Sequence, residues 1–289
     1  MTNDGYQKSI LITVDVEDWF QVENLRSVYP QESWDRCESR VRSNTEKILD
    51  LFDQYGIKST FFVLGWTAQK YPDLVRTIHE RGHEVASHGH WHTLANMLSK
   101  ESLRDNAAKS KAILEDITGY QVVGYRAPSF SITQTMLESL RTLGFQYDSS
   151  LNDFYLNKRY GQVEGVWNSA SEKCMIAKNG LIEIPVSNLK IGRFTLPWAG
   201  GGYFRFWPSW LFQRGVARIL REKGIYVFYC HPWEIDPAQP RVNGIGMLNG
   251  FRHYLNLDKT LTRLQHLFTT FRGERFISCS SYLRLIGLG

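Results

Sequence analysis

Short apolar runs of strand length alternate with segments of helical periodicity along most of this chain. Glycines such as Gly56, Gly82, Gly119 and Gly144 stand where the helical segments end. The predicted strands are 10–16, 58–64, 83–87, 122–125, 145–148, 181–186 and 225–229, and the predicted helices are 45–55, 73–81, 99–118, 133–143, 209–223 and 257–271. Such alternation is typical of a parallel sheet in an α/β fold. About seven units predict a single barrel domain over residues 1–289.

The composition excludes several classes of protein. Apolar residues make up 43% of the 289 residues, which is enough for a large core and excludes a disordered chain. The net charge of +5 comes without a run of five like charges, so we expect no nucleic-acid partner. The four cysteines form no Cys-x-x-Cys pair, which argues against a thiolate zinc site.

No apolar stretch approaches the roughly 18 residues of a membrane span, and the polar N-terminus does not resemble a signal peptide. From the sequence we therefore expect a soluble, cytoplasmic protein without a transmembrane segment. The sequence leaves the oligomeric state open.

Acidic residues follow the first predicted strand. Side chains alternate along a strand, so Asp15 and Glu17 are expected to point the same way, whereas Asp18 points elsewhere. Carboxylates at the rim of a barrel can divide the roles of metal ligand and base. The alternative is a solvated acidic turn.

Three histidines lie within five residues directly after another predicted strand. His88 and His92 have the i, i+4 spacing that brings two imidazoles to one metal ion, and His90 lies between them. Two histidines and one carboxylate would leave coordination positions open for water and substrate. The alternative is a histidine-rich surface loop.

Two further strand ends carry polar groups. Arg126 lies in Tyr-Arg-Ala-Pro and could hold a carboxylate through paired hydrogen bonds, while His231 lies in Cys-His-Pro-Trp-Glu and could act as a general acid. Either residue alone would more often be structural. The segment 197–205 contains three consecutive glycines beside aromatic residues, which predicts a loop whose backbone a ligand can approach.

Together and in this order, these motifs resemble the polysaccharide deacetylases of carbohydrate esterase family four, the NodB-homology proteins. The resemblance implies a distorted (β/α)7-type barrel and a divalent metal, most commonly zinc, with cobalt, nickel or manganese as alternatives. It implies that Asp15 is the general base, that Arg126 orients it, and that His231 is the catalytic acid. Tyr-Asp-Ser-Ser adds Asp148 as a further catalytic residue.

In the metal site that the resemblance implies, His88 and His92 are the ligand pair. The family's usual aspartate ligand is replaced here by Val16, so we expect Glu17 to be the third ligand, with Asp18 as the alternative. The expected substrate-binding residues are Pro128, Tyr203 and Trp233.

Four further motifs are Asp-Val-Glu-Asp-Trp-Phe, Gly-Gly-Gly-Tyr-Phe-Arg, His-Pro-Trp-Glu-Ile-Asp-Pro and Phe-Arg-His-Tyr-Leu-Asn-Leu. They resemble a bacterial subgroup linked to exopolysaccharide and exosortase loci, with a subgroup-specific part from about 196 to 289. The resemblance implies N-deacetylation of an acetylated glycan, which could be lipid-linked. The alternatives are a cyclic amide or ureide hydrolase of the allantoinase-like branch and a non-catalytic glycan-binding barrel. We expect the irregular segments 152–180 and 197–205 to flank the substrate cleft.

Overall fold

The computed structural model describes residues 7–154, 157, 159–170 and 173–289. Within these residues, seven strands run parallel in the spatial order β11-β1-β2-β3-β4-β5-β8. Their bounds are β1 (Ser9–Val16), β2 (Thr60–Val63), β3 (Glu84–Ser87), β4 (Gly124–Tyr125), β5 (Tyr147–Asp148), β8 (Ile182–Glu183) and β11 (Ile225–Cys230). The α/β prediction with a parallel sheet is confirmed.

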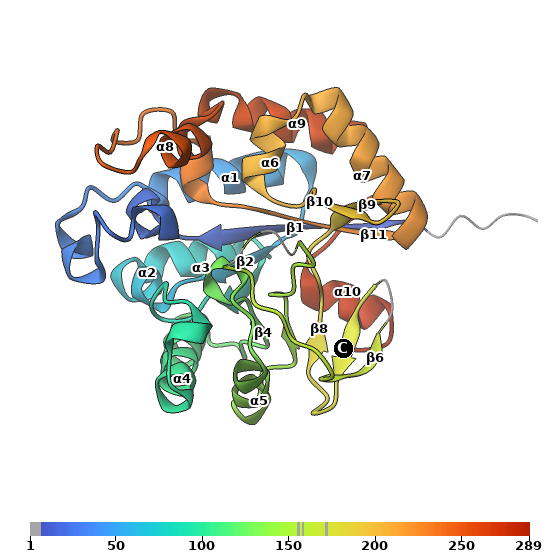
Figure 1. The fold of residues 1–289 in the computed structure, drawn as a ribbon, viewed down its shortest axis with the longest axis horizontal. Helices are drawn as coiled ribbons and strands as arrows, with labels where there is room; N and C mark the ends of the chain where they lie inside the picture. The colour runs from blue at the N-terminus through green and yellow to red at the C-terminus, as the bar shows by residue number, and fades with distance from the viewer. Residues whose placement is uncertain (1–6, 155–156, 158, 171–172) are drawn as a thin grey trace, which may run out of the picture.

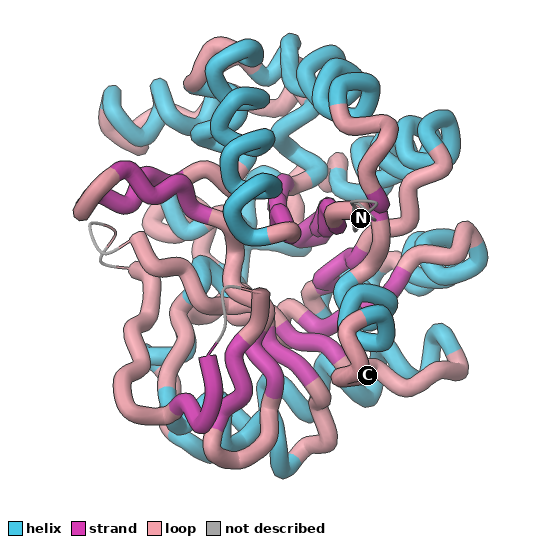
Figure 2. The backbone as a smooth tube through the Cα atoms, turned by 90° about the vertical axis from the view of Figure 1, so that its right-hand side faces the viewer, coloured by secondary structure: helices cyan, strands magenta, loops and turns pink. Residues whose placement is uncertain are grey.

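The row of strands curves until its two edges meet. The backbone N–H of Ser187, just beyond β8, donates to the carbonyl of Val227 in β11 over 3.2 Å, and Gly200 forms a parallel bridge with Tyr229. These contacts close the strands into a distorted barrel, and Figure 2 shows the helices outside the curved row of strands. Since β11 pairs with β1 along its length, the first and last parts of the chain share one sheet.

Helices cover the outer side of the barrel (Figure 1). Their bounds are α1 (Val41–Tyr55), α2 (Gly65–Lys70), α3 (Pro72–Glu80), α4 (Lys100–Thr118), α5 (Gln134–Thr142), α6 (Gly201–Phe206), α7 (Ser209–Lys223), α8 (Met247–Tyr254), α9 (Thr260–Thr270) and α10 (Cys279–Leu285). In the part of the chain that the structure describes, every helix is too short or too polar to cross a bilayer.

Helix α10 covers the end of the barrel where the strands begin. The N–H groups of Cys279 and Ser280 at its start donate to the Thr60 hydroxyl and to the Glu84 carboxylate. Tyr147 donates to the same Glu84 carboxylate from inside the barrel. Because this end is plugged, the functional cleft opens at the other end, toward which the arrow of β1 points in Figure 1.

Several elements differ from the sequence prediction. The segment 197–205, predicted as a loop, contains the end of β10 (Phe194–Pro197), which pairs with β9 (Asn188–Ile191), and most of helix α6. Helix α6 forms despite its glycines because Phe204 packs on Phe212 and Phe228, and such tertiary packing outweighs weak helix propensity.

The remaining differences concern elements other than the seven parallel strands of the barrel. The segment 152–180, predicted as irregular, contains the antiparallel pair β6 (Trp167–Ala170) and β7 (Met175–Ala177). The helix predicted over 257–271 is a 3-10 turn followed by α9. Strand β12 (Arg275–Phe276) beside β1 and helices α2, α8 and α10 were not predicted. These elements are short and carry little periodic signal.

Candidate active site

Three strand ends bring polar side chains to one cleft of about 170 Å³, and a fourth places an arginine behind it. Asp15 comes from β1, His88 follows β3, and His231 follows β11. Arg126 follows β4 and lies fully buried behind Asp15. The cleft therefore occupies the rim formed by the carboxyl ends of the strands, where barrels of this kind carry their catalytic groups.

Alternation along β1 aims Asp15 into the barrel. Ile10, Ile12 and Val14 belong to the core cluster that contains the helix residues, whereas Leu11 belongs to the cluster inside the barrel. Thr13 points to the same side of the strand as Leu11, and its hydroxyl donates to the Phe228 carbonyl on the neighbouring strand β11. Asp15 is the next residue on this side, so its carboxylate faces the interior.

Glu17, His88 and His92 are the group within the described residues that could hold a metal ion. One ligand atom from each lies within 4.8 Å of the others, and all three side chains are buried. Nε2 of His92 comes within 2.9 Å of Oε2 of Glu17. The contact lacks the alignment of a hydrogen bond, so this buried oxygen has no hydrogen-bond partner among the described residues. Donor atoms that converge without bonding one another fit a cation between them.

The surroundings of these residues also fit a metal ion. Nδ1 of His88 lies 2.8 Å from the Arg126 carbonyl, so an Nδ1–H there leaves Nε2 free as the ligand atom. Burial lowers the pKa of His88 to about 4, which keeps the ring neutral. Burial alone would raise the pKa of Glu17, but His92 and His231 outweigh it and lower that pKa to about 2. Both side chains are thus held in the states that bind metals.

Asp15 and Arg126 form a buried ion pair beside this group. Nη1 of Arg126 donates to Oδ1 of Asp15 over 2.8 Å and also to the Thr13 hydroxyl, while Nε and Nη2 donate to Ser149. The guanidinium also stacks over the Phe62 ring at 4.1 Å. Arg126 is therefore fixed, and it orients the Asp15 carboxylate.

His231 follows β11, the strand next to β1, and therefore lies beside Asp15 at the same rim. Its Nε2 is 3.4 Å from Oε1 of Glu17 and 3.9 Å from Oδ2 of Asp15. Burial would lower the pKa of His231, but the carboxylates of Glu17, Glu234 and Asp15 outweigh it and raise that pKa to about 9. A protonated imidazole at the mouth of the cleft can donate a proton to a bound ligand.

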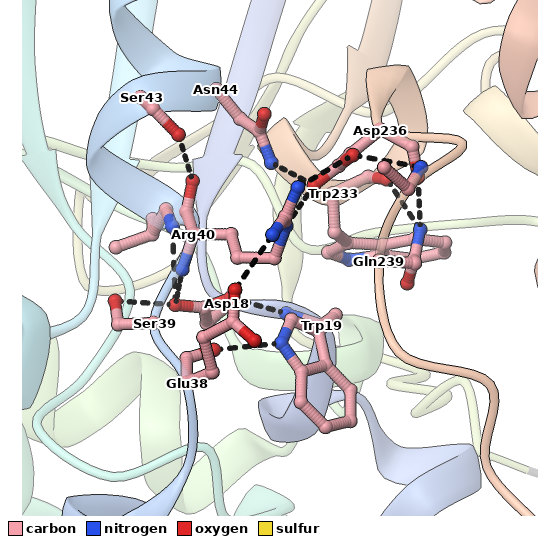
Figure 3. A network of polar contacts seen from close by, with 12 residues as sticks. Asp18, Trp19, Glu38, Ser39, Arg40, Ser43, Asn44, Trp233, Asp236 and Gln239 are labelled. Carbon is pink, nitrogen blue, oxygen red and sulfur yellow. Dashed lines mark hydrogen bonds and ion pairs between the residues drawn. The ribbon is translucent and has the colours of Figure 1, made fainter.

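Asp18, the alternative ligand, points away from the cleft. Its carboxylate accepts from the backbone N–H groups of Trp19, Arg40 and Val41 and from the Ser39 hydroxyl, as Figure 3 shows in part. Three of these hydrogen bonds go to Oδ2 and join the end of β1 to the start of α1. The geometry favours Glu17 as the third ligand.

Two other expected site residues lie outside the cleft as the structure describes it. Oδ1 of Asp148 accepts from the Ser150 hydroxyl, and the carboxylate faces Glu183. Burial raises the pKa of Asp148 to about 6 and that of Glu183 well above its usual value. Pro128 is buried and is absent from the described lining. The strained backbone at Ser129, with φ of 53°, presents Ser129 and the next residue to the cleft instead.

The remaining expected contacts do line the cleft. Tyr203 from α6 and Trp233 from the turn after β11 are lining residues, as are Asn157 and Tyr160 from the segment 152–180. Both segments expected to flank the cleft therefore reach it, although residues 155–156, 158 and 171–172 of the first lie outside the described part.

The triple glycine has a role in packing besides the predicted one. A Cβ on Gly201 would lie 1.7 Å from Oε2 of Glu234, and a Cβ on Gly200 would lie 2.5 Å from the Tyr229 hydroxyl. Gly202 has open space. Two of the glycines therefore let α6 approach the protein's own side chains, while Gly202 lines the cleft, where a ligand can approach its backbone.

Sequence reasoning missed Glu234 and Arg205, a fully buried pair whose Oε1 and Nη2 are 3.4 Å apart beside His231. Glu234 was visible three residues after His231, but its partner lies 29 residues earlier, so no local pattern joins them. The segment from Pro232 to Ile235 forms a 3-10 turn in which Glu234 faces back toward His231.

Comparisons with known proteins find matching family models, relatives and solved structures. The family model for polysaccharide deacetylase matches residues 4–147, and a model described as a domain of unknown function (DUF3473) matches residues 149–284. The chain is 33% identical over 124 residues to a peptidoglycan deacetylase from Helicobacter pylori, and the match covers 42% of each protein. The chain thus spans less than half of that relative.

Solved structures are similar over nearly the whole chain. A Mycobacterium smegmatis protein assigned to the polysaccharide deacetylases has a TM-score of 0.66 at 20% identity, covering 99% of this chain and 92% of that one. A Bacillus anthracis pseudoenzyme of carbohydrate esterase family four has a TM-score of 0.52 at 13% identity, covering 96% and 65%. At these identities the likeness shows the fold alone, and the fold is shared by a pseudoenzyme.

The family match over residues 4–147 contains β1, β3 and β4, which carry Asp15, His88, His92 and Arg126. The strand that carries His231 lies in the second matched segment and closes the same barrel. This chain therefore carries a polysaccharide deacetylase domain of the NodB type, carbohydrate esterase family four.

Proposed function

We propose that the protein is a metal-dependent hydrolase that removes N-acetyl groups from an acetylated amino-sugar glycan. The observation that carries this proposal is the convergence of three groups on one cleft: the metal-binding set Glu17, His88 and His92, the Asp15–Arg126 pair, and His231 beside them. Glycan binding alone would require neither a base nor an acid. The H. pylori relative named as a peptidoglycan deacetylase supports an acetylated amino-sugar polymer as the substrate class.

When bound, a divalent ion supplies Lewis acidity that polarises the acetyl carbonyl and lowers the pKa of water. Two imidazoles and one carboxylate suit zinc, and cobalt, nickel and manganese are alternatives that reconstitution distinguishes. Glu17, His88 and His92 would hold this ion, and their burial excludes competing water from the ligand atoms.

Asp15 takes the proton of the attacking water. Arg126 holds one oxygen of the carboxylate, Oδ1, and leaves Oδ2 directed toward His231 at the end of the neighbouring strand. This oxygen is the one available to accept a proton. A positioned general base of this kind contributes about 10²–10⁴-fold to a hydrolytic rate.

His231 donates a proton to the departing nitrogen. An amine is a poor leaving group unless it is protonated as the C–N bond breaks. Nε2 of His231 faces the cleft 3.9 Å from Oδ2 of Asp15, so the acid and the base can act on one bound group. Tyr203 and Trp233 at the mouth provide aromatic faces that suit pyranose rings.

The test is acetate release from N-acetylated glycans, including chitooligosaccharides, poly-N-acetylglucosamine and peptidoglycan, by protein reconstituted with zinc, cobalt, nickel or manganese. Asp15→Asn should keep the fold and lower kcat by about 10²-fold or more. Asp18→Asn is the matched control, because this buried aspartate points away from the cleft.

Two other outcomes would overturn the proposal. Tight glycan binding without acetate release under any of these metals would favour the glycan-binding barrel. Hydrolysis of a cyclic ureide such as hydantoin, with no release from glycans, would favour the cyclic amide hydrolase.

We further propose that the reaction serves exopolysaccharide biosynthesis in the cytoplasm, with a lipid-linked glycan as one form of the substrate. Support comes from the subgroup motifs, among them the His-Pro-Trp-Glu that begins at His231. Cell fractionation and the acetyl content of the secreted polysaccharide in a deletion strain test this setting. Unchanged acetylation would contradict it.

A further inference from the structure

Glu234 is a buried carboxylate beside His231 that the proposed reaction does not yet use. Its side chain is 2% exposed, and its Oε1 lies 3.5 Å from Nδ1 of His231. Its Oε2 lies 3.4 Å from the backbone N–H of the same residue. The Nδ1 contact is an ion-pair distance, and Nδ1 has no hydrogen-bond partner among the described residues. Glu234 is therefore the acceptor placed to receive an Nδ1–H.

Arg205 from α6 holds Glu234 in this position. Nη2 of Arg205 lies 3.4 Å from Oε1 of Glu234, and the Arg205 side chain is 1% exposed. Its Nη1 donates to the carbonyls of His253 and Leu255 over 3.0 and 2.6 Å. The guanidinium is thus fixed by backbone on one side and holds the carboxylate on the other.

The plane of the His231 ring is fixed by stacking. His231 stacks on Trp233 with centroids 5.3 Å apart and planes 20° apart, and Trp233 stacks on His253 at 4.4 Å and 9°. Nε2 of His253 pairs with Gln239, which anchors the far end of the stack. With its plane set by Trp233 and its Nδ1 facing Glu234, the ring has one nitrogen, Nε2, directed into the cleft.

Asp148, the other carboxylate expected to be catalytic, does not provide this contact. Asp148 faces Ser150 and Glu183 on another part of the barrel. We therefore propose that Glu234, held by Arg205, is the positioning residue that binds Nδ1 of His231 and aims Nε2 at the departing nitrogen. This inference rests on the proposed deacetylation.

The chemistry of the leaving group gives a specific test. When an N-acetyl group is hydrolysed, the water oxygen joins the carbonyl carbon, the C–N bond breaks, and the nitrogen takes a proton from Nε2 as it leaves. In an aryl acetate, a 4-nitrophenolate leaves with the bonding electron pair and needs no proton. Removing a residue that acts through His231 should therefore lower kcat on the amide much more than kcat on the aryl ester.

The experiment compares wild type, Glu234→Gln, His231→Ala and the double variant on an acetylated chitooligosaccharide and on 4-nitrophenyl acetate, with metal-reconstituted protein. Glu234→Gln should lower kcat on the glycan by about 10²-fold with little change in KM, and lower kcat on the aryl ester less than about threefold. In the His231→Ala background, Glu234→Gln should cause no further loss on the glycan.

Asp236→Asn is the matched control, because Asp236 also forms a mostly buried pair with an arginine, Arg40, just beyond the same turn (Figure 3). It should lower the melting temperature without changing the ratio of the two activities. Equal losses of Glu234→Gln on both substrates, or losses that add to those of His231→Ala, would show that Glu234 is only structural.

A second readout does not depend on activity. In protein with ¹⁵N-labelled histidine, the Nδ1 resonance assigned to His231 should shift in Glu234→Gln and stay unchanged in Asp236→Asn. If wild type releases no acetate from any glycan, the proposed function fails while this measurement still tests the contact. An unchanged His231 resonance in Glu234→Gln would overturn the inference.

Discussion

Adding one methyl group at Gly201 should disrupt the active site from outside the cleft. The first turn of α6 packs so closely on Glu234 that a Cβ at Gly201 would lie 1.7 Å from Oε2. Its backbone does not have a positive φ, so alanine is allowed by local conformation. The effect of Gly201→Ala is therefore a steric one on Glu234.

The size of the effect follows from this overlap. Non-bonded atoms prefer separations of about 3.5 Å, so the carboxylate or the helix must move by roughly 1.8 Å. Overpacking costs about 1–3 kcal/mol, and unpairing a buried charge costs about 3–5 kcal/mol, whereas alanine gains about 1 kcal/mol in helix propensity. Because the Glu234 carboxylate keeps part of its pairing after a small shift, we expect the free energy of unfolding to fall by about 2–4 kcal/mol.

The assay is the melting temperature together with acetate release, and Gly202→Ala is the control. Gly202 is the next residue of the same helix, and a Cβ there would meet no atom within 4 Å. Gly202→Ala should therefore leave the melting temperature unchanged or raise it. Gly201→Ala should melt at least about 5 °C lower and lose kcat on glycans. Melting temperatures that agree within about 1 °C between the two variants would refute this account of α6.

His88→Ala should abolish metal binding measured by elemental analysis. Asp18→Asn should retain the metal but lower the melting temperature, because Asp18 accepts backbone hydrogen bonds. If Asp18→Asn lost as much metal as His88→Ala, Asp18 would be a metal ligand. Tyr203→Ala should raise KM for glycans more than it lowers the melting temperature, because Tyr203 lines the cleft and is only half-buried; the reverse would make it a core anchor. Burial lowers the pKa of His83 to about 4, so the native state favours its neutral ring, and this contribution to stability is complete above about pH 6.5 and lost as the pH falls toward 4. His83→Gln should therefore flatten the fall in melting temperature between pH 6.5 and 4.5, and an unchanged slope would count against this assignment.

The sequence by itself determined the strand and helix alternation and the candidate metal ligands. Both depend on short-range order: apolar periodicity marks β1 and α7, and the spacing of His88 and His92 is local. Alternation along β1 was enough to prefer Glu17 to Asp18. Because parallel strands end at one rim, residues at strand ends could be assigned to one site without coordinates.

Only the tertiary structure decided which other groups reach that site. It joined Arg205 to Glu234, excluded Asp148 and Pro128 from the described cleft lining, and folded a triple glycine into α6. These outcomes depend on contacts between segments far apart in the chain. A buried charge is stable only when it is paired, and the pair fits only where a neighbouring residue, here a glycine, has no side chain. The local sequence around each residue does not predict such a pair, because the two residues come together only in the closed barrel.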